Sequence, residues 1–323
     1  MKTHRKILWL STPINATWYI TSKCNLRCTH CYLTDYTKNT EKKIIVGVLD
    51  QLKAMAVRSI SYIGGEPLIR TDLEEIIRMT VERGIEVETC TNGVLADEDR
   101  AASLIKAGCE KFQVSLEGHS PELSDPVRGK DTFQKILNGA GNLKRGGAKV
   151  KLNVTISKQN YKSIPELIKL AESICVDSLR LSAFVPFGTG VQAVEEFQLT
   201  KEDIEDIRRI VSLEMKRSRQ LIESPIFITS PHQNRCGNTF GCGAGTHNLI
   251  INTDLSLSAC DIANEKDRTL PIKNFEDIRG YWLHHPLFKK WRGETDDPDF
   301  EGVHQNHCHL AYMTYKKDLF EHE

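Results

Sequence analysis

The chain has 323 residues, with 43 lysines and arginines against 43 aspartates and glutamates, and 40% of its residues are hydrophobic. This length suits one barrel-sized domain, or a large domain with a small one. The zero formal net charge argues against nucleic-acid binding through a broad basic surface. No apolar run approaches the roughly 18 residues that span a bilayer, and the patch Ile7–Leu10 is too short for a signal peptide. We therefore expect a cytoplasmic protein that binds neither nucleic acid nor membrane.

Short β-rich runs alternate with amphipathic segments in the first part of the chain. The predicted strands are residues 16–22, 58–63, 85–90, 111–116, 149–156 and 176–184, and the predicted helices are 43–56, 73–83, 98–107, 132–145 and 164–173. Helices between successive strands indicate a parallel sheet with right-handed crossovers. Six strands are too few for a closed eight-stranded barrel, so we predict an α/β fold, a partial (β/α)6 TIM-like barrel.

The pattern changes after Gly190. Residues 201–219 predict a charged amphipathic helix, 248–260 a β-hairpin that turns near Asn252–Asp254, and 286–292 a short helix. We expect the barrel to cover residues 1–195, a linking helix 196–225, and a small cysteine-rich extension 226–323.

Three of the ten cysteines, Cys24, Cys28 and Cys31, follow the first predicted strand directly. In a reducing cytosol, clustered cysteines indicate metal binding or catalysis more than disulfides. Zinc usually takes four protein ligands, whereas three thiolates can hold three irons of a cubane cluster and leave one iron open. Buried structural thiols are the alternative, which an exposed loop does not favour. We therefore predict a catalytic iron–sulfur site with an open iron.

The segment Trp18–Tyr32 resembles the signature of the radical S-adenosylmethionine (radical SAM) superfamily, through Cys24-Asn-Leu-Arg-Cys28-Thr-His-Cys31. The resemblance implies that S-adenosylmethionine chelates the open iron of a [4Fe–4S] cluster. The reduced cluster would then cleave the sulfonium to methionine and a 5′-deoxyadenosyl radical. Tyr32 matches the aromatic residue that usually lies beside the adenine.

Other motifs at strand ends extend the resemblance over about residues 15–190. In Gly64-Gly65-Glu66-Pro67, the glycines let a ligand approach the backbone, and the Glu66 carboxylate can accept a hydrogen bond from a ligand ammonium. In the family this motif holds the methionine amino group; an ordinary Gly-Pro turn is the alternative. Asn92 is a further expected cofactor-binding residue. The resemblance implies Ser115 toward the ribose and carboxylate, Asn153 toward the ribose, and Arg128 toward the S-adenosylmethionine carboxylate.

Cys236, Cys242, Cys260 and Cys308 supply four thiolates for a second site. Four cysteines satisfy tetrahedral zinc equally well. Their order resembles the first auxiliary cluster of the SPASM and twitch extensions of the superfamily. No cysteine follows Cys308, so a twitch-like extension with one cluster fits better than a full SPASM domain.

The resemblance thus implies a second, auxiliary [4Fe–4S] cluster that carries electrons or positions the substrate. If one cysteine is not a ligand, we expect it to be Cys236. Further metal-binding candidates around Cys308 are His304, His307 and His309. We expect the isolated Cys90, Cys109 and Cys175 to be packing residues.

Three functions follow from these motifs. The leading hypothesis is a maturase that crosslinks a ribosomal peptide, forms a thioether in it or epimerises it. The second is a radical dehydrogenase, epimerase or cofactor-maturation enzyme for an aminosugar, an aminocyclitol or a tetrapyrrole. The third is a non-catalytic iron–sulfur or zinc scaffold, which the intact motifs at Gly64–Pro67 and Ser115 disfavour.

The expected partners follow from the same hypotheses. The substrate is a peptide or a small molecule, and a reductase such as flavodoxin or ferredoxin supplies the electron. Because 23 residues precede Cys24, we expect no fused peptide-recognition domain. A leader peptide would then need a separate carrier protein.

Overall fold

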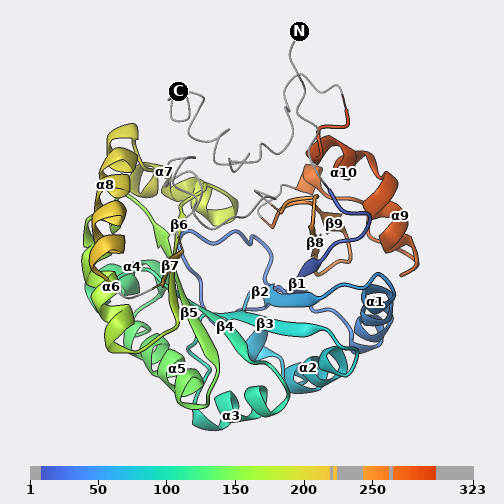
Figure 1. Cartoon of the computed structure of the whole chain (residues 1–323), viewed down its shortest axis with the longest axis horizontal. Coiled ribbons are helices and arrows are strands. Elements are labelled where there is room, and N and C mark those ends of the chain that lie inside the picture. The colour runs from blue at the N-terminus through green and yellow to red at the C-terminus, as the bar shows by residue number, and fades with distance from the viewer. Residues whose placement is uncertain (1–8, 219–220, 224–242, 262–264, 296–323) are drawn as a thin grey trace.

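The structure is a computed structural model that describes residues 9–218, 221–223, 243–261 and 265–295 (Figure 1). Its centre is a nine-stranded sheet in the order β7-β6-β5-β4-β3-β2-β1-β8-β9. The strands are β1 (Asn15–Thr21), β2 (Ser59–Gly64), β3 (Glu86–Thr91), β4 (Lys111–Leu116), β5 (Lys149–Ile156), β6 (Ser178–Ala183), β7 (Leu221–Glu223), β8 (Asn248–Ile251) and β9 (Leu257–Ser258). In the described part, β7 and β9 end the sheet and do not pair with each other, so the barrel is open.

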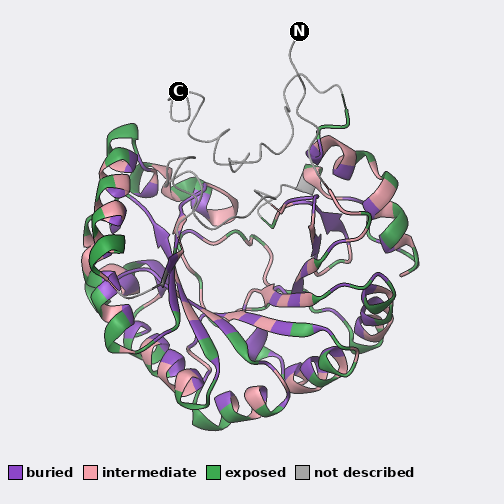
Figure 2. Ribbon diagram, viewed as in Figure 1, coloured by how far each residue is buried: buried purple, intermediate pink, exposed green. Residues whose placement is uncertain are grey.

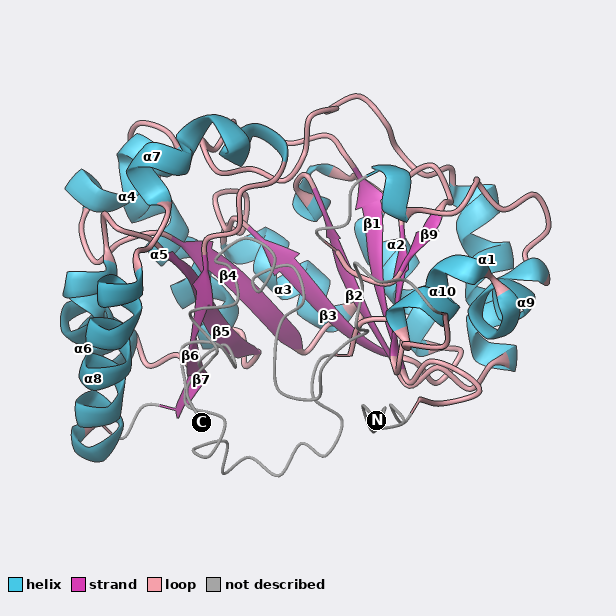
Figure 3. Cartoon of the chain, turned by 90° about the horizontal axis from the view of Figure 1, so that it is seen from above, coloured by secondary structure: helices cyan, strands magenta, loops and turns pink. Residues whose placement is uncertain are grey.

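Most of the helices cover the convex side of this curved sheet (Figures 1 and 3). The helices are α1 (Lys42–Ala54), α2 (Leu73–Val81), α3 (Glu98–Lys106), α4 (Pro121–Arg128), α5 (Phe133–Arg145), α6 (Ile164–Ser173), α7 (Val194–Phe197), α8 (Lys201–Arg217), α9 (Asp277–His284) and α10 (Pro286–Trp291). Neighbours from β1 to β7 pair in parallel. The predicted α/β fold with a partial TIM-like barrel is confirmed, although α4 and α9 were not predicted.

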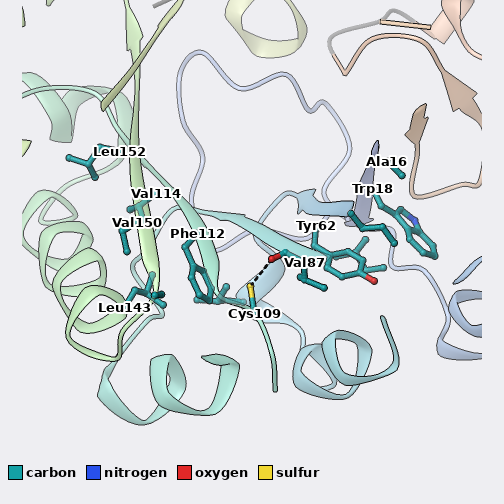
Figure 4. Close-up of a cluster of buried hydrophobic side chains, with 14 of the residues drawn as sticks. Ala16, Trp18, Tyr62, Val87, Cys109, Phe112, Val114, Leu143, Val150 and Leu152 are labelled. Atoms are coloured by element: carbon teal, nitrogen blue, oxygen red, sulfur yellow. Dashed lines mark hydrogen bonds between the residues drawn. The ribbon is translucent and has the colours of Figure 1, made fainter. Parts of the chain in front are cut away.

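The core lies between the sheet and the helices (Figures 2 and 4). Along β4, side chains alternate, so that Phe112 and Val114 are buried against helices while Gln113 and Ser115 lie on the concave side. Cys109 is buried in this core, as predicted, and its thiol lies 3.2 Å from the Thr89 hydroxyl. The concave side of β4 therefore carries polar side chains.

The packing prediction was wrong for two cysteines. Cys90 falls on the half-buried positions of β3, whose alternation sends its side chain to the concave face. Cys175 is exposed at the turn after α6, where its φ of 55° carries it away from the core.

The predicted hairpin is confirmed and extends the barrel sheet. β8 pairs in parallel with β1, and β9 returns antiparallel to β8 through a turn that the Asn252 N–H closes onto the Ser256 carbonyl. Trp282 of α9 is fully buried and donates its indole N–H to the Leu10 carbonyl at 2.8 Å. In the described part of the chain, no helix is long and apolar enough to cross a membrane.

The core packing predicts a large difference between two leucines. Leu104 on α3 is 0% exposed, whereas Leu213 on α8 is 45% exposed. We expect Leu104→Ala to lower the free energy of unfolding by about 2–5 kcal/mol, because it leaves a cavity. Leu213→Ala should change it by less than about 0.5 kcal/mol. Urea unfolding followed by circular dichroism measures both, and equal effects would contradict the assigned core.

Candidate active site

The first cysteine group lies on the loop that leaves the carboxyl end of β1. Cys24, Cys28 and Cys31 are free thiols and are half-buried. Backbone N–H groups of Leu26 and Leu33 donate to the sulfurs of Cys24 and Cys31, each at 3.4 Å. Two side chains add further N–H donors, from Asn92 to Cys24 and from Arg128 to Cys28, each at 3.9 Å. This surrounding of N–H donors suits thiolates that carry negative charge.

The glycines at the end of β2 pack directly against this loop. A Cβ atom on Gly65 would lie 2.3 Å from the Lys23 carbonyl oxygen and 2.5 Å from that of Ser22. The same close approach allows the Gly65 N–H to bond the Thr21 carbonyl and the Glu66 N–H to bond the Lys23 carbonyl, both at 2.8 Å. A larger residue than glycine therefore cannot occupy position 65 without displacing the start of the cysteine loop.

Glu66 joins the ends of β2 and β3. Its buried carboxylate accepts hydrogen bonds from the Thr91 hydroxyl at 2.7 Å, from the Asn92 N–H at 2.6 Å and from the Leu68 N–H at 3.0 Å. Burial raises the pKa of Glu66, although these bonds and Arg128 oppose the rise. The protein thus uses three of about four acceptor positions on the carboxylate. Its bond to a ligand ammonium stays a prediction.

Asn92 bridges β3 and the cysteine loop. Its amide Nδ2 donates to Asn25 Oδ1 at 2.8 Å, and its Oδ1 accepts the Val94 N–H at 3.0 Å. Both ends of the amide are therefore engaged, which orients the Nδ2 toward Cys24.

Arg128, at the end of α4, lies in a buried charge network that motif analysis missed. Its guanidinium donates to Glu117 Oε1 at 2.5 Å, and the His30 Nε2 lies 3.3 Å from the same oxygen. His30 itself lies on the cysteine loop, between Cys28 and Cys31. The sequence signal for this network was Glu117, directly after β4. A single carboxylate forms no motif that would distinguish it from other acidic residues.

The segment after β6 holds the other side of the cysteine loop. The Thr189 N–H donates to the Cys31 carbonyl at 2.9 Å, and its hydroxyl donates to the same oxygen at 3.1 Å. Gly188 has φ +56°, and a Cβ there would lie 2.3 Å from the Tyr32 carbonyl oxygen. From the sequence, this glycine-rich segment was predicted to end the alternation of strands and helices, and no part in the site was predicted for it.

Ser115 and Asn153 are neighbours across β4 and β5. Both are half-buried on the concave face, and the Ser182 hydroxyl donates to Asn153 Oδ1 at 2.8 Å. Tyr32 is 39% exposed, directly after Cys31. The structure thus brings Gly64, Gly65, Glu66, Asn92 and Arg128 against the cysteine loop, while Ser115 and Asn153 lie side by side on the barrel wall.

Residues 18–171 match the model of the radical SAM superfamily. This segment contains the cysteine loop, the Gly64–Glu66 turn and the Glu117–Arg128 pair. The chain is a radical SAM enzyme.

Two curated relatives cover different shares of this radical SAM enzyme. It is 27% identical over 292 residues to the mycofactocin maturase MftC of Mycolicibacterium smegmatis. The matched region covers 88% of this chain and 73% of MftC. It is 33% identical over 211 residues to the Fe-coproporphyrin III synthase of Methanosarcina barkeri, which covers 64% of this chain and 52% of that protein.

Among solved structures, the fold is similar to that of Streptococcus suis SuiB bound to its precursor peptide SuiA. The TM-score is 0.71 at 19% identity, over 88% of this chain and 67% of SuiB. At this identity the likeness shows the shared fold, which includes the partial barrel.

The donor set of the radical SAM domain fits the [4Fe–4S] cluster and S-adenosylmethionine that the family implies. Cys24, Cys28 and Cys31 would hold the cluster. In the described part, no group of three or more His, Cys, Asp or Glu side chains has the geometry of a single metal-ion site. Each of the three thiolates would bind a different iron of the cubane. The three sulfurs therefore need not point at one common metal ion. Burial raises the pKa of Cys24 to about 11 and also raises that of Cys28, so cluster binding must displace thiol protons.

One ligand candidate of the auxiliary site lies close to β1. Cys260 follows β9, and the carbonyl of the next residue, Asp261, accepts the Tyr19 hydroxyl of β1 at 2.7 Å. Cys236, Cys242 and Cys308 lie outside the described residues, as do His304, His307 and His309.

The contacts of Gly65 predict that cluster loading depends on it. We expect Gly65→Ala to lose most of its iron after anaerobic reconstitution, because the new Cβ meets two backbone carbonyls of the cysteine loop. Gly280→Ala is the matched control, since a Cβ on Gly280 of α9 has no atom within 4 Å. Iron per chain measures the effect, and a fully loaded Gly65→Ala variant would show that the loop tolerates the displacement.

Proposed function

We propose that this radical SAM enzyme is a peptide maturase, which crosslinks a ribosomal peptide, forms a thioether in it or epimerises it. The observation that carries the proposal is the 27% identity to a mycofactocin maturase over 88% of the chain. SuiB, which shares the fold, was solved with a precursor peptide. When bound, the cluster and S-adenosylmethionine supply a 5′-deoxyadenosyl radical that abstracts a substrate hydrogen.

The chain's own contribution is to hold the cofactors and the substrate. We assign the cluster to Cys24, Cys28 and Cys31. The residues that we assign to S-adenosylmethionine are Tyr32, Gly64, Gly65, Glu66, Asn92, Ser115, Arg128 and Asn153. A primary radical can abstract an unactivated hydrogen when the target carbon is held close and water is excluded. Substrate binding in the barrel would hold the target carbon close.

The concave wall supports an amide-rich substrate. Lys151 Nζ lies 3.1 Å from Glu223 Oε2, Glu88 Oε2 accepts the Ser61 hydroxyl at 3.0 Å, and Arg180 is the register neighbour of Asn153. Such a wall offers hydrogen-bond donors and acceptors and charges of both signs, which suit the amide groups and charged side chains of a peptide. In the described part of the chain β7 and β9 are separate sheet edges, and we place an extended peptide between them.

For the C-terminal part we propose a twitch-like extension over residues 226–323, after a barrel over 1–195 and a linking segment over 196–225. Cys236, Cys242, Cys260 and Cys308 would bind an auxiliary [4Fe–4S] cluster that carries electrons. The hydrogen bond between Tyr19 and the residue after Cys260 supports a place for this cluster beside β1. A reductase such as flavodoxin or ferredoxin, and a separate leader-peptide carrier protein, would complete the system.

A tetrapyrrole is the second candidate substrate. It is favoured by the 33% identity to an Fe-coproporphyrin III synthase, which is higher than the identity to MftC but covers 64% of the chain.

The cluster assignment predicts the behaviour of Cys28→Ala. The wild type should bind roughly eight irons, four in each cubane, and form 5′-deoxyadenosine with dithionite and S-adenosylmethionine. Cys28→Ala should keep about four irons and form no 5′-deoxyadenosine, because the first cluster loses a ligand. Cys175→Ala, which removes an exposed thiol outside the site, should match the wild type. Assays of iron, zinc and 5′-deoxyadenosine measure these outcomes. About four irons plus zinc in the wild type would show that the second site binds zinc and not an auxiliary cluster.

The maturase proposal predicts a modified peptide. The enzyme should be produced together with each short open reading frame encoded beside its gene, and the peptides compared by mass spectrometry with those made beside Cys28→Ala. A crosslink or thioether removes one hydrogen from each bonded atom, and epimerisation in heavy water introduces deuterium. Unchanged peptides, together with formation of Fe-coproporphyrin III from a tetrapyrrole precursor, would assign the enzyme to the second substrate class.

A further inference from the structure

The guanidinium of Arg128 is held beside a cluster ligand. Its side chain is 9% exposed, and one terminal nitrogen lies 3.9 Å from the sulfur of Cys28. The other terminal nitrogen lies 2.5 Å from Glu117 Oε1. The buried Nε has no hydrogen-bond partner in the described structure. Glu117 is therefore the acceptor that orients the guanidinium toward Cys28.

Glu117 carries its negative charge in a buried position. Its side chain is 2% exposed, directly after β4. Burial alone raises the pKa of this carboxyl. His30 and Arg128 together lower the pKa by more than burial raises it, so it lies below the usual value. The carboxylate and the guanidinium thus form a charge pair with almost no solvent to screen it.

The position of this pair has a consequence for the cluster. The reduction potential of an iron–sulfur cluster depends on nearby charge and on hydrogen bonds to its sulfurs. A positive charge beside a ligand stabilises the reduced, more negative state, and so raises the potential and weakens the cluster as a reductant. Reductive cleavage of S-adenosylmethionine requires the opposite. An unpaired arginine at Cys28 would therefore hinder the reaction.

We propose that Glu117 is a positioning residue that keeps the cluster strongly reducing, by neutralising Arg128 while holding its N–H against Cys28. The pair gives the ligand a hydrogen bond without adding net charge. The carbonyl of Val127, which accepts the Thr29 N–H at 3.1 Å, fixes the end of α4 to the cysteine loop and keeps the guanidinium near the ligand. The proposal concerns the cluster alone and is independent of the substrate.

The test is the midpoint potential of the first cluster in the reconstituted full chain, measured by an EPR-monitored redox titration without substrate. Glu117→Gln keeps the shape and removes the charge. We expect its potential to become more positive by about 59 mV, the shift that changes a one-electron equilibrium tenfold. Formation of 5′-deoxyadenosine with a fixed reductant should slow accordingly. Glu122→Gln removes a charge from an exposed position of α4 and should leave the potential unchanged.

A second pair of variants keeps the test decisive if Glu117→Gln does not retain the cluster. Arg128→Gln should shift the potential in the negative direction, because it leaves Glu117 unpaired. Adding Glu117→Gln to Arg128→Gln should return the potential toward that of the wild type. An unchanged potential in both comparisons would overturn the proposal. Loss of the first cluster from all of these variants would also overturn it, since the pair would then hold the loop and not set the potential.

Discussion

The site depends on the close approach of strand ends to one loop. The cysteine loop leaves β1 and is bonded through its backbone to Glu66 after β2 and to Thr189 after β6, while Gly65 bonds the end of β1. These contacts need glycine at positions 65 and 188, where any Cβ would meet a carbonyl oxygen. Strands that are distant along the sheet therefore share one loop, and the curvature of the barrel is what brings them to it. The arrangement of the three thiols is a property of the whole sheet.

Polar groups in this site are engaged mainly with one another. Glu66 accepts from Thr91 and Asn92, and Glu117 pairs with Arg128. Such mutual satisfaction orients each side chain before a ligand arrives, which lowers the entropy that binding must overcome. It also explains why the residues of the cofactor motifs serve the protein scaffold as well as the cofactor. Ser115 and Asn153 lie side by side and half-buried on the concave face.

The regular elements were readily predicted from the sequence. Alternation along β4 and the apolar face of α5 carry strong periodic signals, because each must bury one face against the other. Helix α4 was missed because Pro126 lies inside it and its turns are short and polar. The cysteine loop was found because the spacing of its three cysteines is typical of thiolates that bind an iron–sulfur cluster. His30, Glu117 and Thr189 were not assigned to the site, since single polar residues have no spacing that marks them.

The sequence by itself determined which cysteines are candidate cluster ligands, where strands and helices alternate in the first part of the chain, and that each motif follows a strand. These are local properties, set by the spacing of cysteines and by hydrophobic periodicity. Tertiary structure alone decided that β8 extends the barrel through β1 and that Arg128 pairs with Glu117 beside Cys28. Both depend on how far the sheet curves and which strand ends meet, and those distances arise from packing between segments far apart in the chain.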